Sequence, residues 1–131
     1  MTQQEKSFLM IEPNSFIKMR DEYFANAELF AGKKEFRKAS ELLWGAVTQT
    51  IKALAATRGF EIRSHTQFFD YMRSLSKELR SESLYKSFLF LNDLHKNFYD
   101  ERISPVDFEI YFKEAYKFIL EIDKLMKKTS P

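Results

Sequence analysis

The sequence has no cysteine, only two histidines, and just three glycines and three prolines among its 131 residues. The absence of cysteine excludes disulfides, thiol nucleophiles and thiolate metal sites. With two histidines, a metal site would need closely spaced carboxylates. Asp93 and Asp100, with Asn97 between them, share one face of a predicted helix, but we expect that face to be solvated and to lie opposite His95. We therefore expect neither a metal ion nor a cofactor.

A strong net charge and long apolar runs are also missing. The 21 Lys and Arg residues nearly balance the 19 Asp and Glu residues, and a net charge of +2 does not by itself indicate nucleic-acid binding. The longest uncharged run, residues 42–51, is about half of the roughly 20 residues that a membrane span requires. Residues 1–13 carry Glu5, Lys6 and Glu12 around a short apolar patch, unlike a signal peptide. We expect a soluble, cytoplasmic protein with no membrane segment.

Aromatic residues are abundant, with 14 Phe, 6 Tyr and 1 Trp. Many large side chains and few helix breakers favour long helices that pack through aromatic contacts. The predicted helices run from Asn14 or Ser15 to Gly32, from about residue 34 to 58, from Ser64 through Leu79, from Ser81 or Ser83 through Phe98, and from Ser104 to about residue 128. Ser64 and Gln67 form a capping-box pattern.

The fold class predicted from these segments is all-α. We expect an antiparallel up-and-down bundle of four main helices plus one additional helix, in a single domain over residues 1–131 with a core of about 14–128. Gly45 lies in the middle of the second predicted helix, where glycine costs about 1 kcal/mol relative to alanine. We therefore expect it to admit a neighbouring helix at close range, with Trp44 beside it as an anchor.

His95 lies in the middle of the apolar stripe of the fourth predicted helix, formed by Leu84, Phe88, Leu91 and Phe98. Its ring is expected to point inward, where Asn92 and Tyr99 could join it in one small polar spot. Two interpretations remain open. His95 is either a neutral core residue, bonded to a carbonyl or to a tyrosine hydroxyl, or a functional group.

Two local clusters of basic residues offer further sites. The segment "GKKEFRK", residues 32–38, is either a phosphate-binding turn in which Phe36 stacks on a base, or a solvated turn in which Phe36 is buried and Glu35 cancels part of the charge. The segment "TRGFEIRSH", residues 57–65, brings Arg58, Arg63 and His65 near a helix amino terminus. It is either an anion site or an ordinary cap region.

Residues 35–65, "EFRKASELLWGAVTQTIKALAATRGFEIRSH", and residues 94–100, "LHKNFYD", resemble the archaeal repeat-associated PaREP proteins. That group is similar in turn to the HEPN superfamily of nucleotide-binding domains, and the resemblance covers about residues 19–102. It implies an antiparallel helical bundle that is often a homodimer. HEPN members act as metal-independent RNases, act as nucleotide-binding partners of nucleotidyltransferases in toxin–antitoxin pairs, or have no known activity.

The resemblance implies that RNase members have an arginine a few residues before the histidine of their fourth helix. His95 takes the histidine position, but the arginine positions hold Phe88, Leu89 and Phe90, which cannot neutralise a phosphorane. Arg58 and His65 have the required spacing, but they straddle a helix end. A cation from elsewhere could complete the site, and the candidates are Lys52, Arg58, Arg63 and Lys96.

The sequence thus favours a non-catalytic HEPN-like bundle that binds RNA, a nucleotide or a protein partner such as a nucleotidyltransferase, as a homodimer. The candidate ligand-binding residues are Asn92, His95, Tyr99, Arg58, Arg63 and His65. One alternative is a metal-independent endoribonuclease that uses His95, which requires an accessible His95 near a cation. Another is a purely structural interaction module, which predicts no pocket around the fourth helix.

Overall fold

Helices joined by short turns and loops make up the residues that the computed structural model describes, which are 12–100 and 102–129. Its elements are α2 (Pro13–Gly32), α3 (Phe36–Thr57), α4 (His65–Glu78), α5 (Glu82–Asp100), the 3-10 turn η1 (Pro105–Asp107) and α6 (Phe108–Thr129). The predicted all-helical fold is confirmed for this part of the chain. The expectation that the amino-terminal stretch is not a signal peptide concerns residues that lie, up to residue 11, outside the described part.

The helix boundaries follow from local chemistry, with two corrections to the predicted caps. Ser64 caps α4 in the predicted capping box, in which its hydroxyl accepts from the Gln67 amide. In contrast, α2 begins at Pro13 with Glu12 at the N-cap, because a proline at the first position already has a helical φ. Neither Asn14 nor Ser15 is its cap. The helix α3 begins at Phe36 rather than Lys34, since Lys34 has a left-handed φ of 62°.

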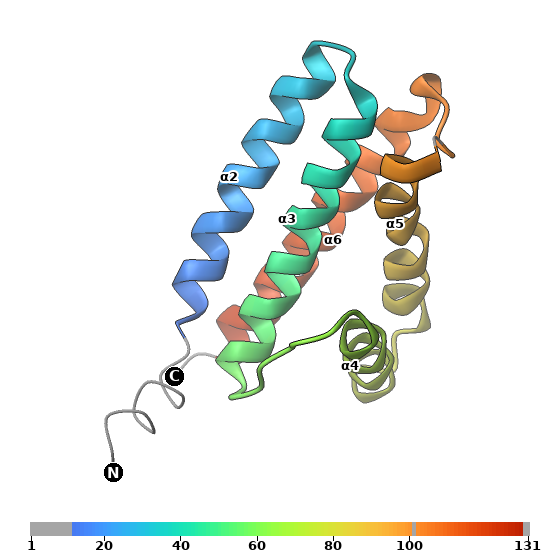
Figure 1. Ribbon diagram of the computed structural model, residues 1–131. Coiled ribbons are helices and arrows are strands. Elements are labelled where there is room, and N and C mark those ends of the chain that lie inside the picture. Colours follow the sequence, from blue (N-terminus) through green and yellow to red (C-terminus); the bar gives the residue numbers. More distant parts are fainter. Residues whose placement is uncertain (1–11, 101, 130–131) are drawn as a thin grey trace.

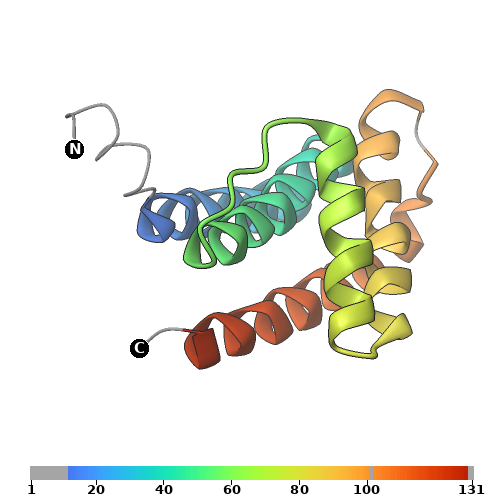
Figure 2. The same ribbon diagram turned by 90° about the horizontal axis from the view of Figure 1, so that it is seen from below.

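The central element is α3. In Figure 1, α2 and α3 lie side by side and are joined by a short turn, while α6 and α5 lie on the other side of α3. The shorter α4 crosses the lower end of this group, and Figure 2 shows its axis steeply inclined to that of α3. The residues of α3 that are buried are Ala39, Ser40, Leu43, Trp44, Ala46, Val47, Thr50, Ile51, Ala53, Leu54, Ala55 and Ala56. This helix therefore supplies much of the core against which the others pack.

No helix in residues 12–100 and 102–129 combines the length and the apolar character that crossing a membrane would require.

Gly45 lets α2 approach α3 closely, as its position predicted. A Cβ atom built on Gly45 would lie 2.9 Å from Cδ2 of Tyr23 on α2, which is closer than real Cβ atoms come to other heavy atoms. Trp44 does not anchor this contact. Its buried indole points toward α5, where its centroid is 5.5 Å from that of Phe88 and 6.1 Å from that of His95. Adjacent residues on a helix point about 100° apart, so they reach different neighbours.

Asn97 was predicted to lie on a solvated face, and the structure contradicts this. Its side chain is 1% exposed, its amide donates to the Ser40 hydroxyl at 3.0 Å, and its carbonyl oxygen accepts from the Ile103 amide at 2.6 Å. Asp93, on the same face, accepts a hydrogen bond from the Tyr111 hydroxyl at 3.1 Å. The face is covered at Asn97 and partly at Asp93, by α3, α6 and the chain after α5, whereas Asp100 at the end of α5 is exposed as expected. A helical wheel of α5 alone does not reveal this covering.

We predict that Gly45→Ala destabilises the protein, although alanine has the higher helix propensity. The added methyl group would displace the Tyr23 ring, and overpacking of this kind costs about 1–3 kcal/mol. The matched control is Gly32→Ala at the end of α2, where an added Cβ meets no atom within 4 Å. Urea unfolding would measure both variants, and equal stability of the two would contradict the close contact.

We predict a late tyrosine titration at Tyr111. Burial, followed by the hydrogen bond to Asp93 and the charges of Asp93 and Asp107, raises the pKa of Tyr111 from 10 to about 12. The unfolded chain loses this proton near pH 10, so the folded state retains it longer and is destabilised progressively as the pH rises from about 10 to 12.

Absorbance at 295 nm would follow the titration. The pKa of Tyr71 is also raised, chiefly by burial, so Tyr111→Phe should remove one of two late steps. Asp93→Asn should move the Tyr111 step to lower pH. An unchanged curve above pH 11 in Tyr111→Phe would show that this hydroxyl does not titrate late.

Candidate functional site

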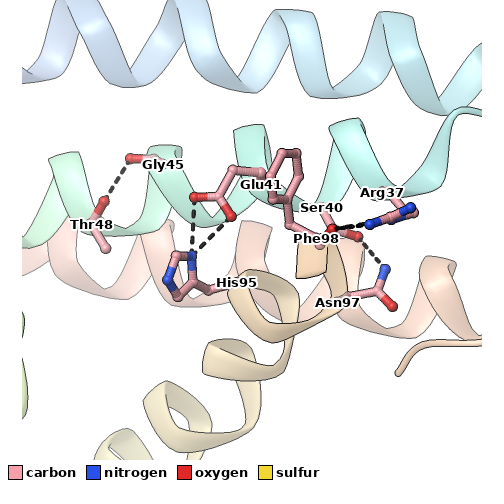
Figure 3. A network of polar contacts seen from close by, with 8 residues as sticks. All are labelled: Arg37, Ser40, Glu41, Gly45, Thr48, His95, Asn97 and Phe98. Carbon is pink, nitrogen blue, oxygen red and sulfur yellow. Dashed lines mark hydrogen bonds and ion pairs between the residues drawn. The ribbon is translucent and has the colours of Figure 1, made fainter. Parts of the chain in front are cut away.

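His95 forms a hydrogen-bonded pair with Glu41, which projects from α3 toward α5. The Nδ1 atom of His95 is 2.9 Å from Oε2 and 3.1 Å from Oε1 of Glu41. Figure 3 shows the two side chains facing each other across the gap between the helices. The side chains are 30% and 35% exposed, so the pair is open to solvent. The partner is neither a carbonyl nor a tyrosine hydroxyl, and the expected inward-pointing core histidine is not what the structure contains.

His65 lies beside His95, although thirty residues separate them in the sequence. The two ring centroids are 5.7 Å apart. His65 is the first residue of α4 and directly follows the N-cap Ser64, so the capping box fixes the position of the His65 backbone. The edge of Phe69, one turn along α4, meets the His65 ring with centroids 5.2 Å apart. The two histidines of the chain, which belong to separate segments of the sequence, therefore form one cluster.

Aromatic rings surround this cluster on two sides. The indole of Trp44 stacks on His95 at 26° between planes, and the Tyr99 ring meets His95 edge-on with centroids 5.4 Å apart. Tyr99 is 67% exposed, so most of its ring remains accessible. The cluster thus combines imidazoles, a carboxylate and exposed aromatic surface.

A cavity of about 390 Å³ adjoins the cluster and runs along one face of α3. Glu41, His65 and Lys52 are among its lining residues, together with Tyr23 and Gln49. The Lys52 ammonium lies 5.9 Å from the centroid of the Phe68 ring. The Oε1 atom of Gln49 is buried and has no hydrogen-bond partner in the described part of the chain. Such a cavity offers a cation, an imidazole and a carboxylate to a polar ligand.

The other predicted site residues differ in whether they contact the histidine cluster. Arg58 pairs with Glu78 at 2.8 Å, and Arg63 pairs with Glu61 at 2.9 Å. The predicted polar spot is formed only in part, because Tyr99 contacts His95 whereas the buried Asn92 Oδ1 has no partner among residues 12–100 and 102–129.

The positions where the RNase motif would have its arginine offer no cation to this site. Phe88 is fully buried and packs against Trp44 and Phe69. Leu89 is exposed, and the ring of Phe90 stacks on that of Tyr111 at a centroid distance of 4.1 Å. In the described residues, no three His, Asp or Glu side chains are arranged to hold a metal ion.

Glu41 was not predicted as a site residue, although the sequence contains a signal for it. Glu41 and Lys52 are the only charged residues between Ala39 and Thr57. Eleven residues correspond to about three helical turns, so the two charges share one face of α3. An isolated pair of opposite charges on one face of an otherwise uncharged stretch, residues 39–57, indicates a site, and Thr48 and Gly45 lie between them on that face.

We predict that Glu41 fixes the tautomer of neutral His95. A carboxylate accepts hydrogen bonds only, so the bond to Glu41 requires a proton on Nδ1 and leaves the lone pair on Nε2. Imidazole ¹⁵N chemical shifts would report a protonated Nδ1, and Glu41→Ala would abolish this preference. His65, which has no hydrogen bond to its ring in the described part of the structure, is the internal control. A protonated Nε2 in the neutral wild-type His95 would contradict the pairing.

Comparison with known proteins gives a single assignment. The sequence model of the archaeal PaREP1/PaREP8 family matches residues 15–119, which is most of the chain and includes Glu41, Lys52, His65 and His95. No curated protein and no solved structure matches the chain. On the strength of the family match, the chain belongs to the archaeal PaREP1/PaREP8 family.

Proposed function

We propose that this protein binds single-stranded RNA or a nucleotide, without cleaving it, at the cluster of His65, His95 and Glu41 and in the adjoining cavity. The observation that carries the proposal is the meeting of the two histidines at 5.7 Å beside a cavity lined by Lys52. The Lys52 ammonium and the N–H groups of protonated imidazoles are donors suited to phosphate oxygens. For His95 this requires a proton on Nε2 in addition to the one on Nδ1 that Glu41 accepts. The site is open, because His95 is almost one third exposed.

The aromatic rings near the histidines offer surfaces on which the bases of such a ligand can stack. Bases stack on aromatic side chains with about 1–3 kcal/mol per base, without sequence preference. Tyr99 is exposed and lies edge-on to His95, and Phe69 lies against His65. A phosphate near Lys52 and a base near Tyr99 would both contact the same cluster. A metal ion is not needed for this mode of binding.

The HEPN-like arrangement belongs to this proposal. It would make α2, α3, α5 and α6 the four main helices of an antiparallel up-and-down bundle and α4 the additional one. The short turn between α2 and α3 and the inclined, shorter α4 support it. One cavity is lined by Tyr23 of α2, by residues of α3 and by His65 of α4, and another is lined in part by Asn97 and Phe98 of α5. The latter favours a binding protein over a purely structural module, for which we expected no pocket around the fourth helix.

We also propose that the protein is a cytoplasmic homodimer and that a nucleotidyltransferase-type protein is a further partner. Large apolar side chains that remain exposed on the single chain support an interface of this kind. They include Leu29 on α2 and Ile110, Tyr116 and Leu120 on α6. The concentration dependence of the sedimentation coefficient tests the dimer.

We predict that Lys52→Gln weakens RNA binding and that Lys113→Gln does not. Both changes remove one positive charge, but Lys113 lies on the outer face of α6, paired with Glu109. Fluorescence anisotropy of a labelled single-stranded RNA, with a metal chelator present, would measure the affinity. Loss of one phosphate contact should also reduce the slope of log K, the logarithm of the binding constant, against the logarithm of the salt concentration by about 0.7. Equal effects of the two substitutions would indicate non-specific attraction and contradict the site.

A second function, metal-independent RNA cleavage, is favoured by one observation, the bond of Glu41 to Nδ1 of His95. This bond leaves Nε2 as the basic atom of the ring. In such a reaction Nε2 would take the proton of a ribose 2′-hydroxyl, the 2′-oxygen would bond to phosphorus, and the 5′-oxygen would leave with a proton from His65. Lys52 would then supply the cation that the arginine supplies in the RNase members.

Incubation of labelled RNA with the protein and EDTA separates the two functions. Binding without cleavage is the result we propose. Cleavage that is lost in folded His95→Ala and His65→Ala variants would replace the non-catalytic proposal by the enzymatic one. Circular dichroism checks the fold of each variant.

A further inference from the structure

A second cavity, of about 680 Å³, lies where the turn between α2 and α3 meets the end of α5. Three cations and one carboxylate are among its lining residues: Lys34, Arg37, Lys38 and Glu35. The rings of Phe36 and Phe98 contribute apolar walls. The volume is within the range of small-molecule sites, and the net charge of the lining favours an anion.

The cations of this cavity differ in how they are held. The Arg37 guanidinium donates from Nε at 3.0 Å and from Nη2 at 2.7 Å to the Phe98 carbonyl, in the last turn of α5. Arg37 is thereby a structural clamp between α3 and α5. Lys38 lies 3.7 Å from Glu35 and above the ring of Phe30. For Lys34, no ion pair or side-chain hydrogen bond is present within residues 12–100 and 102–129, so its ammonium is available to a ligand.

Lys34 also has an unfavourable backbone. Its φ of 62° is left-handed, a conformation that glycine adopts at no steric cost and that a lysine rarely adopts. The turn therefore retains a cation at a position where glycine would fit better. Phe36, for which either base stacking or burial was expected, packs on Phe108 with centroids 5.2 Å apart, so it forms a wall rather than a free stacking ring.

This cavity and the histidine cluster lie about one helical turn apart along α3 and α5. Arg37 precedes Glu41 by one turn of α3, and Phe98 follows His95 by about one turn of α5 (Figure 3). At the other end of the same face, Lys52 lies fifteen residues from Arg37, which corresponds to about 22 Å along the helix. That length exceeds what one nucleotide spans. The two cavities thus form consecutive sites along α3.

We infer that the cavity at the α2–α3 turn is a second phosphate subsite, and that the ligand is an oligonucleotide lying along α3 rather than a mononucleotide. The inference rests on the proposed function of the histidine cluster. Lys34 and Lys38 hold a phosphate of the strand, and Arg37 holds α3 and α5 at the spacing that keeps the cavity open. An octanucleotide can contact both sites at once, whereas a dinucleotide contacts only one. The octanucleotide therefore binds with the higher affinity.

The decisive variant is Lys34→Gly, with Arg80→Gly as its matched control. Arg80 is the other non-glycine residue of the described part with a positive φ, at 53°, and it follows α4. Both substitutions remove one charge and relieve one left-handed backbone, so neither should lower the melting temperature. Lys34→Gly should weaken octanucleotide binding several-fold, lower the salt slope by about 0.7 and leave dinucleotide binding unchanged. Arg80→Gly should change neither affinity.

Fluorescence anisotropy with both labelled RNAs separates the possible failures. If the octanucleotide binds no tighter than the dinucleotide, or if Lys34→Gly and Arg80→Gly behave alike, the second subsite is wrong. Loss of dinucleotide binding in Lys52→Gln would then still support the histidine site. If the wild type binds neither RNA, the proposed function and the subsite are both overturned.

Discussion

The burial of α3 among α2, α5 and α6 is the constraint on which the rest of the structure depends. Almost every residue of its central part is apolar or small, and only Glu41 and Lys52 are charged between residues 39 and 57. A carboxylate near a core is costly unless it is hydrogen-bonded. Glu41 meets this requirement at the edge of the core by bonding His95, which ties α5 to α3 and also builds the candidate site.

Polar contacts at the two ends of α3 then set the geometry around this pair. At its amino-terminal end, Arg37 binds the Phe98 carbonyl and Ser40 accepts from Asn97, so the last turns of α5 are fixed against α3. Asn97 also binds the Ile103 amide, which holds the chain that leads into α6. At the other end, the capping box of α4 places His65 where its ring reaches His95. The same contacts that stabilise the fold therefore position the imidazoles.

Local sequence signals predicted the helices and part of the packing. The Ser64 capping box and the mid-helix Gly45 depend on neighbouring residues or on the backbone itself, so one segment contains the information. The meeting of His65 with His95 and the burial of Asn97 depend on how α4 and the chain after α5 cross distant helices. No periodicity within one helix contains that information. The resemblance to the PaREP proteins predicted the family but not Glu41, because the RNase motif draws attention to arginine positions that are apolar here.

We propose that the two histidines form one phosphate-binding site. Imidazole ¹H–¹⁵N spectra recorded during titration with an unlabelled RNA dinucleotide test it most directly, because the chain has only two histidines and each gives its own signals. We expect both rings to shift together and to saturate at one ligand concentration, and we expect Lys52→Gln to raise that concentration. Binding detected by another method, with both imidazole signals unmoved, would show that the histidines do not form the ligand site.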